Sequence, residues 1–451
     1  MSGNQDGDAV TPLGDSSVPD DAGSGSTGPG RRGVLGALGA GAVGLVAGAA
    51  GGFLGGRSSA APSDSGSAPA AADGGIVEFL GEHQAGIATP VQDRMHLAAF
   101  DVTSTRRDDL VSLMKDFSSA IGYMTRGIPI DSDAGSDPLS PPADTGEAYG
   151  LSPGHLTVTV GFGRSLFVDA HGKDRFGLAS KMPEGLIELP HFAGDMLEEA
   201  RSGGDLVVQA CADDPQVAVH AIRNLSRIAF GRASVRWSQI GFGRTASTST
   251  AQATPRNLFG FKDGTANLKA EDPQLLEEHV WIADQKGDTA WANGGSYLVA
   301  RRIRMLIETW DRQNLGEQEK VVGRDKKQGA PLSGGTEFTA PDFSRAGPDG
   351  RKIDADSHVA LAHPSRNKGA QMLRRGYNYA DGTDGLGRLD AGLFFIAYVT
   401  DPRTHYVPMQ TAISGHDLMQ EYVRHTGSGL FVVPPGINAA GGYLGQGLLE
   451  G

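Results

Sequence analysis

Cysteine is almost absent from this 451-residue sequence, which contains one such residue, Cys211. A single cysteine excludes an internal disulfide, a zinc cluster built on cysteines, and the C-x-x-C-H motif that attaches a covalent prosthetic group. Cys211 lies in the apolar run DLVVQACADD, and this setting predicts a buried, unreactive thiol. Chemistry that needs more than one thiol is therefore excluded for this chain.

Basic clusters are also scarce. The chain has 40 Lys and Arg residues against 53 Asp and Glu residues, which gives a formal net charge of −13. Lys and Arg form short pairs and no longer basic run. Because nucleic-acid binding needs a concentrated positive surface, we expect no nucleic-acid partner.

The first 30 residues contain no Lys or Arg, and the pair Arg31-Arg32 then leads into an uncharged Gly/Ala-rich apolar stretch that ends before Arg57. Small residues follow in the segment 58–75, which offers cleavage sites. This order resembles a twin-arginine export signal, although Gly30 and Val34 replace its usual Ser/Thr and Phe. We therefore predict that residues 1–75 are a signal peptide and linker read by the twin-arginine export machinery. The protein would be extracellular, periplasmic or associated with the cell envelope, and a weak transmembrane anchor is the alternative.

Hydrophobic periodicity after the linker predicts two copies of one βαββαβ pattern. In the first copy we expect strands at 95–104, 155–163, 204–213 and 235–244, with helices at 106–124 and 214–230. In the second we expect strands at 295–306, 372–379, 391–401 and 430–435, with helices at 309–323 and 415–427. The prediction is an α+β fold of two ferredoxin-like lobes with antiparallel sheets, over 76–250 and 251–451. A ligand crevice between lobe elements is expected.

The segment GFKDG places one carboxylate, Asp263, between Gly260 and Gly264 on the connection between the two copies. Glycines let the backbone approach a flat ligand closely, and the carboxylate could then point into the crevice. The alternative is an aspartate that stabilises a tight turn through its own backbone. The motif alone does not decide between them.

The segment 354–379 supplies two histidines, His358 and His363, and the pair Arg374-Arg375. A lone histidine in an apolar run is most often a core residue. Together with a loop aspartate and an arginine, however, it could hold a haem iron, because one neutral imidazole suffices on the proximal side. The distal side then remains free for an acid/base group and a cation.

Many segments over residues 76–440 together resemble the dye-decolourising (DyP-type) haem peroxidases, in particular the exported deferrochelatase/peroxidase subgroup. The family fold is a pair of ferredoxin-like lobes, in agreement with the repeated pattern. The matching segments are GEHQAGI (81–87), GFKDGTAN (260–267), GSYLVARRIRM (295–305), ETWDR (308–312), GAPL (329–332), DSHVALAHP (356–364), LRRGYNY (373–379), LFFIAYVTDPR (393–403) and HTGSGLFVVPPG (425–436).

The resemblance implies that His358 is the axial iron ligand of a non-covalent haem b and that Asp263 is the distal acid/base. It makes Arg374 the distal cation, with Arg375 as its rival; strand alternation allows only one of the two to reach the iron. Glu421 matches the acidic residue that accepts the proximal imidazole N–H, with a solvent-facing helix glutamate as the alternative. Further haem contacts are implied for Gly264, Thr265, Ala266, Lys326, His363, Pro364 and Ser365.

The implied function is reduction of hydrogen peroxide with oxidation of dyes, phenolics or other bulky organic or protein reductants. Two alternatives stay open: release of iron from haem (deferrochelatase activity), and a haem carrier without turnover. The sequence is also compatible with a homodimer. Phe394 and Phe395 either line the distal pocket or pack in the sheet core. Candidates for carrying electrons to the surface are Tyr377, Tyr379, Trp237 and Trp310.

Overall fold

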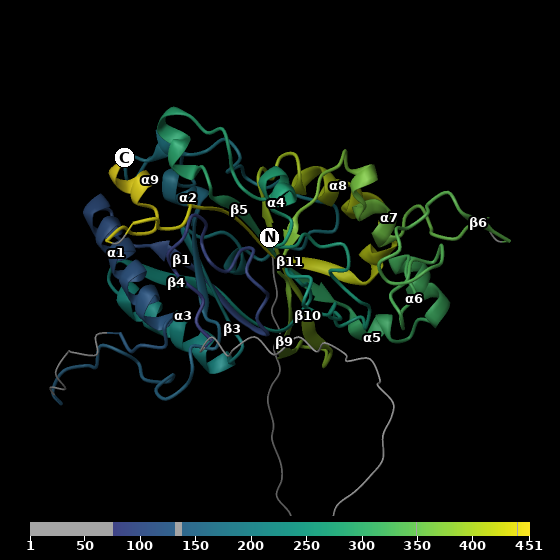
Figure 1. Cartoon of the computed structure of the whole chain (residues 1–451), viewed down its shortest axis with the longest axis horizontal. Coiled ribbons are helices and arrows are strands. Elements are labelled where there is room, and N and C mark those ends of the chain that lie inside the picture. The colour runs from purple at the N-terminus through teal and green to yellow at the C-terminus, as the bar shows by residue number, and fades with distance from the viewer. Residues whose placement is uncertain (1–74, 131–137, 349, 440) are drawn as a thin grey trace, which may run out of the picture. The chain divides into compact units, whose positions relative to one another are not determined.

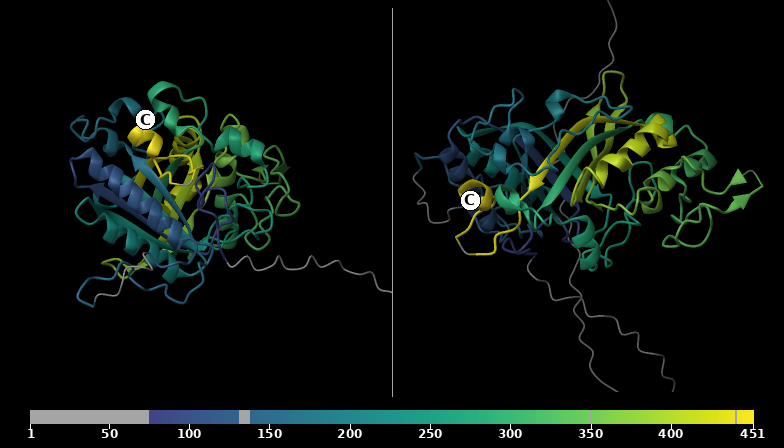
Figure 2. Two further views of the ribbon diagram at one scale, coloured as in Figure 1. Left: turned by 60° about the vertical axis from the view of Figure 1, so that its left-hand side comes forward. Right: turned by 90° about the horizontal axis from the view of Figure 1, so that it is seen from above.

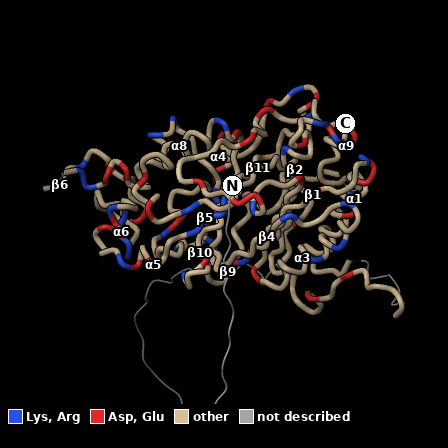
Figure 3. The backbone as a smooth tube through the Cα atoms, turned by 180° about the vertical axis from the view of Figure 1, so that it is seen from behind, with Lys and Arg blue, Asp and Glu red and all other residues tan. Residues whose placement is uncertain are grey.

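The computed structural model describes residues 75–130, 138–348, 350–439 and 441–451 (Figure 1). The predicted export signal and the alternative membrane anchor lie outside these residues. None of the helices in the described ranges combines the length and the apolar composition that crossing a bilayer requires. Basic and acidic segments alternate along the visible backbone and do not separate into two regions (Figure 3).

The first βαββαβ copy is present, and each boundary lies within two residues of its predicted position. Asp214 caps α3 by accepting a hydrogen bond from the Gln216 N–H, and Pro215 occupies the first helical position. The strands pair antiparallel in the order β2-β3-β1-β4, and α1 and α3 lie side by side over one face (Figure 2). The elements are β1 (Arg94–Val102), α1 (Arg107–Met124), β2 (Thr157–Gly163), β3 (Leu206–Ala212), α3 (Pro215–Ala229) and β4 (Ala233–Arg244).

The second copy contributes four long or medium strands, which pair antiparallel in the order β11-β5-β10-β9. These are β5 (Ser296–Met305), β9 (Tyr377–Thr383), β10 (Leu389–Val399) and β11 (Val423–Val433). The remaining strands are β6 (Ala346–Gly347), β7 (Gly350–Arg351) and β8 (Leu373–Arg374). The remaining helices are α2 (Arg164–Phe167), α4 (Pro273–His279), α5 (Ile307–Trp310), α6 (Leu315–Val322), α7 (His358–Ala362), α8 (Tyr406–His416) and α9 (Gln446–Glu450).

The two copies share a single nine-stranded sheet, whereas the sequence had predicted two sheets. Phe431 of β11 pairs with Gly163 of β2, and Phe242 of β4 pairs with Asn378 of β9. Because β5 pairs with both β11 and β10, the sheet closes on itself. One core draws apolar side chains from strands of both copies, among them Leu97, Val207, Leu298, Phe394 and Phe431. The antiparallel α+β class is confirmed.

Three elements of the second copy differ from the prediction. The expected helix 309–323 is two short helices, α5 and α6. The expected strand 372–379 is interrupted between β8 and β9, where a Cβ on Gly376 would lie 2.7 Å from Thr245 Oγ1. The helix expected at 415–427 was wrong: α8 ends at His416, and β11 already pairs with β5 at Val423↔Met305. Strand pairing with a distant segment here overrides local helical periodicity.

Candidate active site

The loop that carries Asp263 has a backbone which requires its glycines. Gly260 and Gly264 have φ angles of +83° and +90°, in the left-handed region. A Cβ on Gly264 would also lie 2.8 Å from the Cα of Ala246, so a side chain would collide with backbone. The Asp263 carboxylate does not bond to its own turn: Oδ2 accepts a hydrogen bond from Asn257 Nδ2 at 3.2 Å. The tight-turn alternative therefore does not explain this aspartate.

Asp263 faces Arg374, as the sequence predicted. Arg374 Nη1 donates to Asp263 Oδ1 at 2.9 Å, and both side chains keep some exposure, 28% and 16% respectively. Asn267 fixes the backbone of Arg374 on both sides, because its Oδ1 accepts from the Arg374 N–H and its Nδ2 donates to the Arg374 carbonyl. The guanidinium is thereby held beside the carboxylate.

Arg375 points to the opposite side of the strand and is completely buried. Its guanidinium donates to the carbonyl oxygen of Thr89 and to Oε1 of Gln92. Every one of these contacts lies away from Asp263. Of the two adjacent arginines, the structure brings only Arg374 to the candidate site.

His358 is the first residue of α7, and its Nδ1 lies 2.6 Å from Oδ2 of Asp417. Asp417 is the acidic partner that the sequence assigned to Glu421, so that assignment was wrong. The cause is the misplaced helix: α8 ends at His416, and Asp417 caps the following 3₁₀ turn, Leu418–Glu421, by accepting from the Met419 N–H. The Asp417 side chain is fully buried, while Glu421 is exposed. An aspartate placed as a cap between two helical segments is the sequence signal that could have identified it.

Three charged groups act on the His358 imidazole. Burial favours the neutral ring, but the charge and hydrogen bond of Asp417 outweigh it and raise the pKa of His358 above its usual value. Asp263 also raises this pKa and Arg374 lowers it, so both groups lie near the imidazole. His358 nevertheless keeps 37% of its side chain exposed. The imidazole that Asp417 holds is therefore within electrostatic reach of the Asp263–Arg374 pair.

These residues fit a haem. Among the described residues, none hydrogen-bonds to Nε2 of His358, which leaves that nitrogen for iron, while Nδ1 is held by a carboxylate as metal-bound imidazoles usually are. Asp263 and Arg374 present a carboxylate beside a guanidinium, the two kinds of group that acid/base chemistry on the distal side would require. Glycines at 260 and 264 let the loop approach a flat group closely.

The other predicted haem contacts have partners within the protein. Lys326 Nζ donates to Gln318 at 2.7 Å, and the Thr265 hydroxyl donates to Glu337 at 3.3 Å. In the turn formed by His363, Pro364 and Ser365, the Ser365 N–H donates to Nδ1 of His363. Gly264 is buried and Ala266 exposed. The haem contacts of these residues stay predictions.

The aromatic residues predicted to line the distal pocket or to carry electrons differ in their burial and in the face of the sheet that they occupy. Phe394 belongs to the sheet core, where its ring centroid lies 6.2 Å from that of Trp237. Phe395 is two residues from Ala397, which pairs with Arg374, so Phe395 shares the face of Arg374. Among the predicted electron carriers, Trp310, Tyr377 and Tyr379 are buried and Trp237 is partly exposed.

Comparison with known proteins identifies relatives over most of the chain. Residues 84–243 match the family model described as Dyp-type peroxidase, N-terminal, and residues 254–438 match Dyp-type peroxidase, C-terminal. The deferrochelatase of Escherichia coli K12 is 39% identical over 376 residues, which cover 82% of this chain and 87% of that protein. Ferric DtpA from Streptomyces lividans superimposes with a TM-score of 0.76 at 40% identity, over 85% of this chain and 100% of DtpA. A DyP-type peroxidase from Streptomyces coelicolor gives 0.74 at 41% identity, over 83% and 97%. The chain therefore belongs to the Dyp-type peroxidase family of haem-dependent oxidoreductases.

Proposed function

We propose that this protein reduces hydrogen peroxide and oxidises bulky organic or protein reductants, such as dyes and phenolics, with a non-covalent haem b held by His358. One observation carries the proposal: the Asp263–Arg374 pair acts electrostatically on the same imidazole that Asp417 holds at Nδ1. The bound haem would supply the iron that accepts the oxidising equivalents of peroxide. Proton transfer and charge stabilisation would be carried out by side chains of the protein.

Asp263 takes a proton from one oxygen of the peroxide and returns it to the other, which leaves as water. Arg374 stabilises the negative charge that develops while the O–O bond breaks. Its 2.9 Å contact with Asp263 keeps both groups aligned before peroxide enters. Asp417 accepts the Nδ1–H of His358, fixes the ring orientation and makes the imidazole a stronger donor.

The half-sheet orders β2-β3-β1-β4 and β11-β5-β10-β9 support the two ferredoxin-like lobes proposed for residues 76–250 and 251–451. In each half, the first and third strands of the copy lie in the middle and the second and fourth lie outside. His358, Asp263 and Arg374 all belong to the second lobe. We place the haem in the crevice formed by this lobe. The homodimer remains a proposal.

Iron release is the second candidate function, because the curated relatives are named deferrochelatase. We expect the haem-loaded protein to consume peroxide and oxidise a phenol while it retains its iron. Turnover would be followed by the colour of the oxidised phenol, and iron release by a ferrous chelator together with the fluorescence of metal-free porphyrin. Rising porphyrin fluorescence without peroxide consumption would favour iron release over peroxidase activity.

The contact between the Asp417 carboxylate and Nδ1 of His358 leads to a second prediction. Asp417→Asn should shift the reduction potential of the bound haem to a more positive value, because a neutral amide gives the imidazole less anionic character than a carboxylate. Spectroelectrochemical titration would measure the shift. Glu421→Gln is the matched control, since Glu421 is exposed and lies outside the contact with His358. A shift of the reduction potential in Glu421→Gln with none in Asp417→Asn would instead identify Glu421 as the residue that accepts the imidazole N–H.

We also propose export by the twin-arginine route, supported by the order of the arginine pair, apolar stretch and small residues. Replacing Arg31 and Arg32 with lysine should leave the protein inside the cell, whereas the parent should be recovered outside the cytoplasm without roughly its first 60–70 residues. Cell fractionation and N-terminal sequencing would measure both. Secretion of the double variant, or a full-length membrane-bound chain, would contradict export by this route.

A further inference from the structure

A cavity of about 500 Å³ opens where β4 passes β5, β9 and β10. The residues proposed for peroxide chemistry do not line it. Its walls come from strands of both copies and from the turn before β3. They include two aromatic rings, three guanidinium groups and one carboxylate: Trp237, Phe394, Arg201, Arg236, Arg302 and Asp381.

The apolar wall of this cavity is rigid. The indole of Trp237 is fixed by a 2.9 Å hydrogen bond from its Nε1 to the carbonyl of Gly203, and it meets Phe394 edge to face. A fixed, accessible indole beside a second ring suits a flat aromatic ligand.

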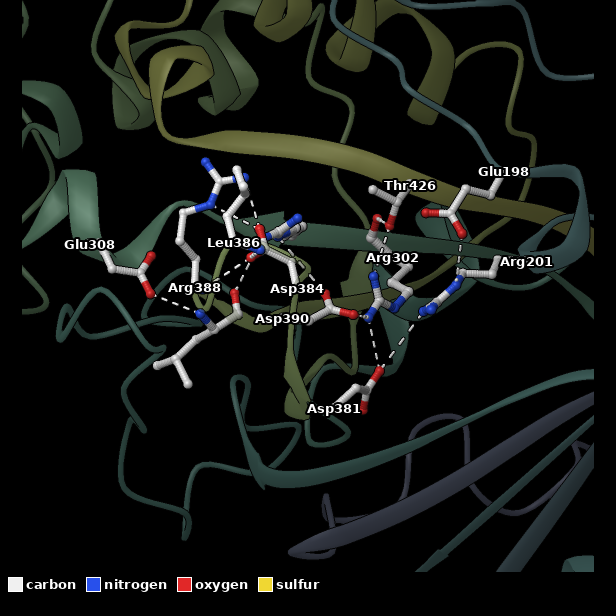
Figure 4. A network of polar contacts seen from close by, with 12 residues as sticks. Glu198, Arg201, Arg302, Glu308, Asp381, Asp384, Leu386, Arg388, Asp390 and Thr426 are labelled. Atoms are coloured by element: carbon white, nitrogen blue, oxygen red, sulfur yellow. Dashed lines mark hydrogen bonds and ion pairs between the residues drawn. The ribbon is translucent and has the colours of Figure 1, made fainter. Parts of the chain in front are cut away.

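The polar wall centres on Asp381 (Figure 4). Its Oδ2 accepts from Arg302 at 2.9 Å and lies 4.0 Å from Nη1 of Arg201. Nε2 of Gln239 donates to Oδ1 at 3.1 Å and to Oδ2 at 3.2 Å. A carboxylate has about four lone-pair positions, and 33% of this side chain is exposed. Asp381 can therefore accept a further hydrogen bond from a ligand.

The arginines around the cavity already have acidic partners. Arg302 bonds to Asp390 as well as to Asp381, Arg201 pairs with Glu198 at 3.0 Å, and Arg236 pairs with Asp101 at 3.2 Å. An anionic ligand would therefore compete with, and be repelled by, the carboxylates that these arginines already hold. A neutral aromatic molecule with a hydroxyl donor fits the wall as it stands.

We propose that this cavity binds a neutral phenol, with its ring against Trp237 and its hydroxyl donating to Asp381. The inference rests on the proposed peroxidase function, because it assigns the phenol as the reductant. One-electron oxidation breaks the phenol O–H bond: the electron reduces the peroxide-oxidised enzyme, the proton goes to the Asp381 carboxylate, and a phenoxyl radical leaves. Phe394 lines the cavity and its neighbour Phe395 shares the face of Arg374, so one strand separates the cavity from the candidate active site.

Calorimetric titration of the full haem-loaded protein with 2,6-dimethoxyphenol tests the site. Trp237→Leu should weaken binding by about 3- to 10-fold through loss of the aromatic contact. Asp381→Asn should weaken it about fivefold, because a charged acceptor becomes neutral, and should slow phenol oxidation at saturating phenol. Trp291→Phe and Asp116→Asn are controls outside the cavity and should bind as the parent does. A sulfonated phenol should bind the parent more weakly.

The peroxide-dependent change in the haem spectrum, measured on the same variants, distinguishes failure of the proposed phenol site from failure of the proposed peroxidase function. If that change is normal but phenol affinity is the same in the parent, Trp237→Leu and Asp381→Asn, the cavity assignment is wrong and the peroxidase function stands. If the parent does not respond to peroxide while phenol affinity still depends on Trp237, the binding site stands and the proposed function fails. Tighter binding of the sulfonated phenol would overturn the preference for a neutral ligand.

Discussion

Replacing Asp263 with asparagine is expected to slow the reaction with hydrogen peroxide by about 10²–10⁴-fold, the usual loss for a general acid/base. Asparagine keeps the size of the side chain and can still accept the hydrogen bond from Arg374. It cannot take a proton from peroxide, however, so proton transfer should fail while haem binding is retained. Rapid mixing with excess peroxide, followed by the change in the haem spectrum, would measure the rate.

The adjacent arginines provide an internal contrast for this result. Arg374→Leu should slow the same reaction by about 10²–10³-fold with little loss of stability, because it removes a charge stabiliser at a partly exposed position. Arg375→Leu should instead lower the free energy of unfolding by about 1–3 kcal/mol, because the buried Oε1 of Gln92 loses its donor, whereas the Thr89 carbonyl still accepts from the Thr248 hydroxyl. Asp116→Asn, on α1, should match the parent in both measurements. Parent rates in both Asp263→Asn and Arg374→Leu would refute the proposed proton transfer.

Replacing His358 with alanine should abolish haem binding or grossly perturb the Soret band of the purified protein. The imidazole is the candidate axial ligand with a carboxylate behind it, and no other described side chain occupies its Nε2. Titration of the haem-free protein with haem, monitored by absorption, would measure the loss.

His363→Ala is the matched control for His358→Ala. Burial and then Arg324 lower the pKa of His363, and Nδ1 of this ring is engaged with Ser365. Because His363 is predicted to contact the haem without ligating the iron, the variant should keep the Soret band of the parent, and any effect should be on haem affinity alone. Loss of haem in His363→Ala together with retention in His358→Ala would move the ligand to His363.

The sequence predicted those features that depend on local periodicity and on side chains adjacent along the chain. The first copy was placed within two residues because its helices and strands have clean patterns and a capping signal at Asp214. Strand alternation predicted that Arg374 and Arg375 point to opposite faces. The choice of Arg374 and of Asp263 came from the family resemblance, because neither alternation nor the glycine-flanked motif decides it.

Features that depend on distant pairing were not predictable in this way. Closure of the sheet depends on short contacts such as Phe431↔Gly163, between residues far apart in the chain. Glu421 was chosen in place of Asp417 because the expected helix 415–427 runs through a segment that the pairing of β11 with β5 makes a strand from Val423 onward. The cavity beside Trp237 combines residues from β4, β5, β9 and β10, so it exists only after the sheet has closed.

Closure of the sheet also constrains how the protein is made on the ribosome. β11, the last strand, pairs with both β5 and β2, so the sheet cannot close until residue 433 has left the exit tunnel. Before then, the growing chain presents unpaired strand edges, which are prone to aggregation. Asp417 follows His358 by 59 residues, so the contact between these two side chains forms only after both have left the ribosome. Nascent chains truncated before β11 should need a chaperone to remain soluble.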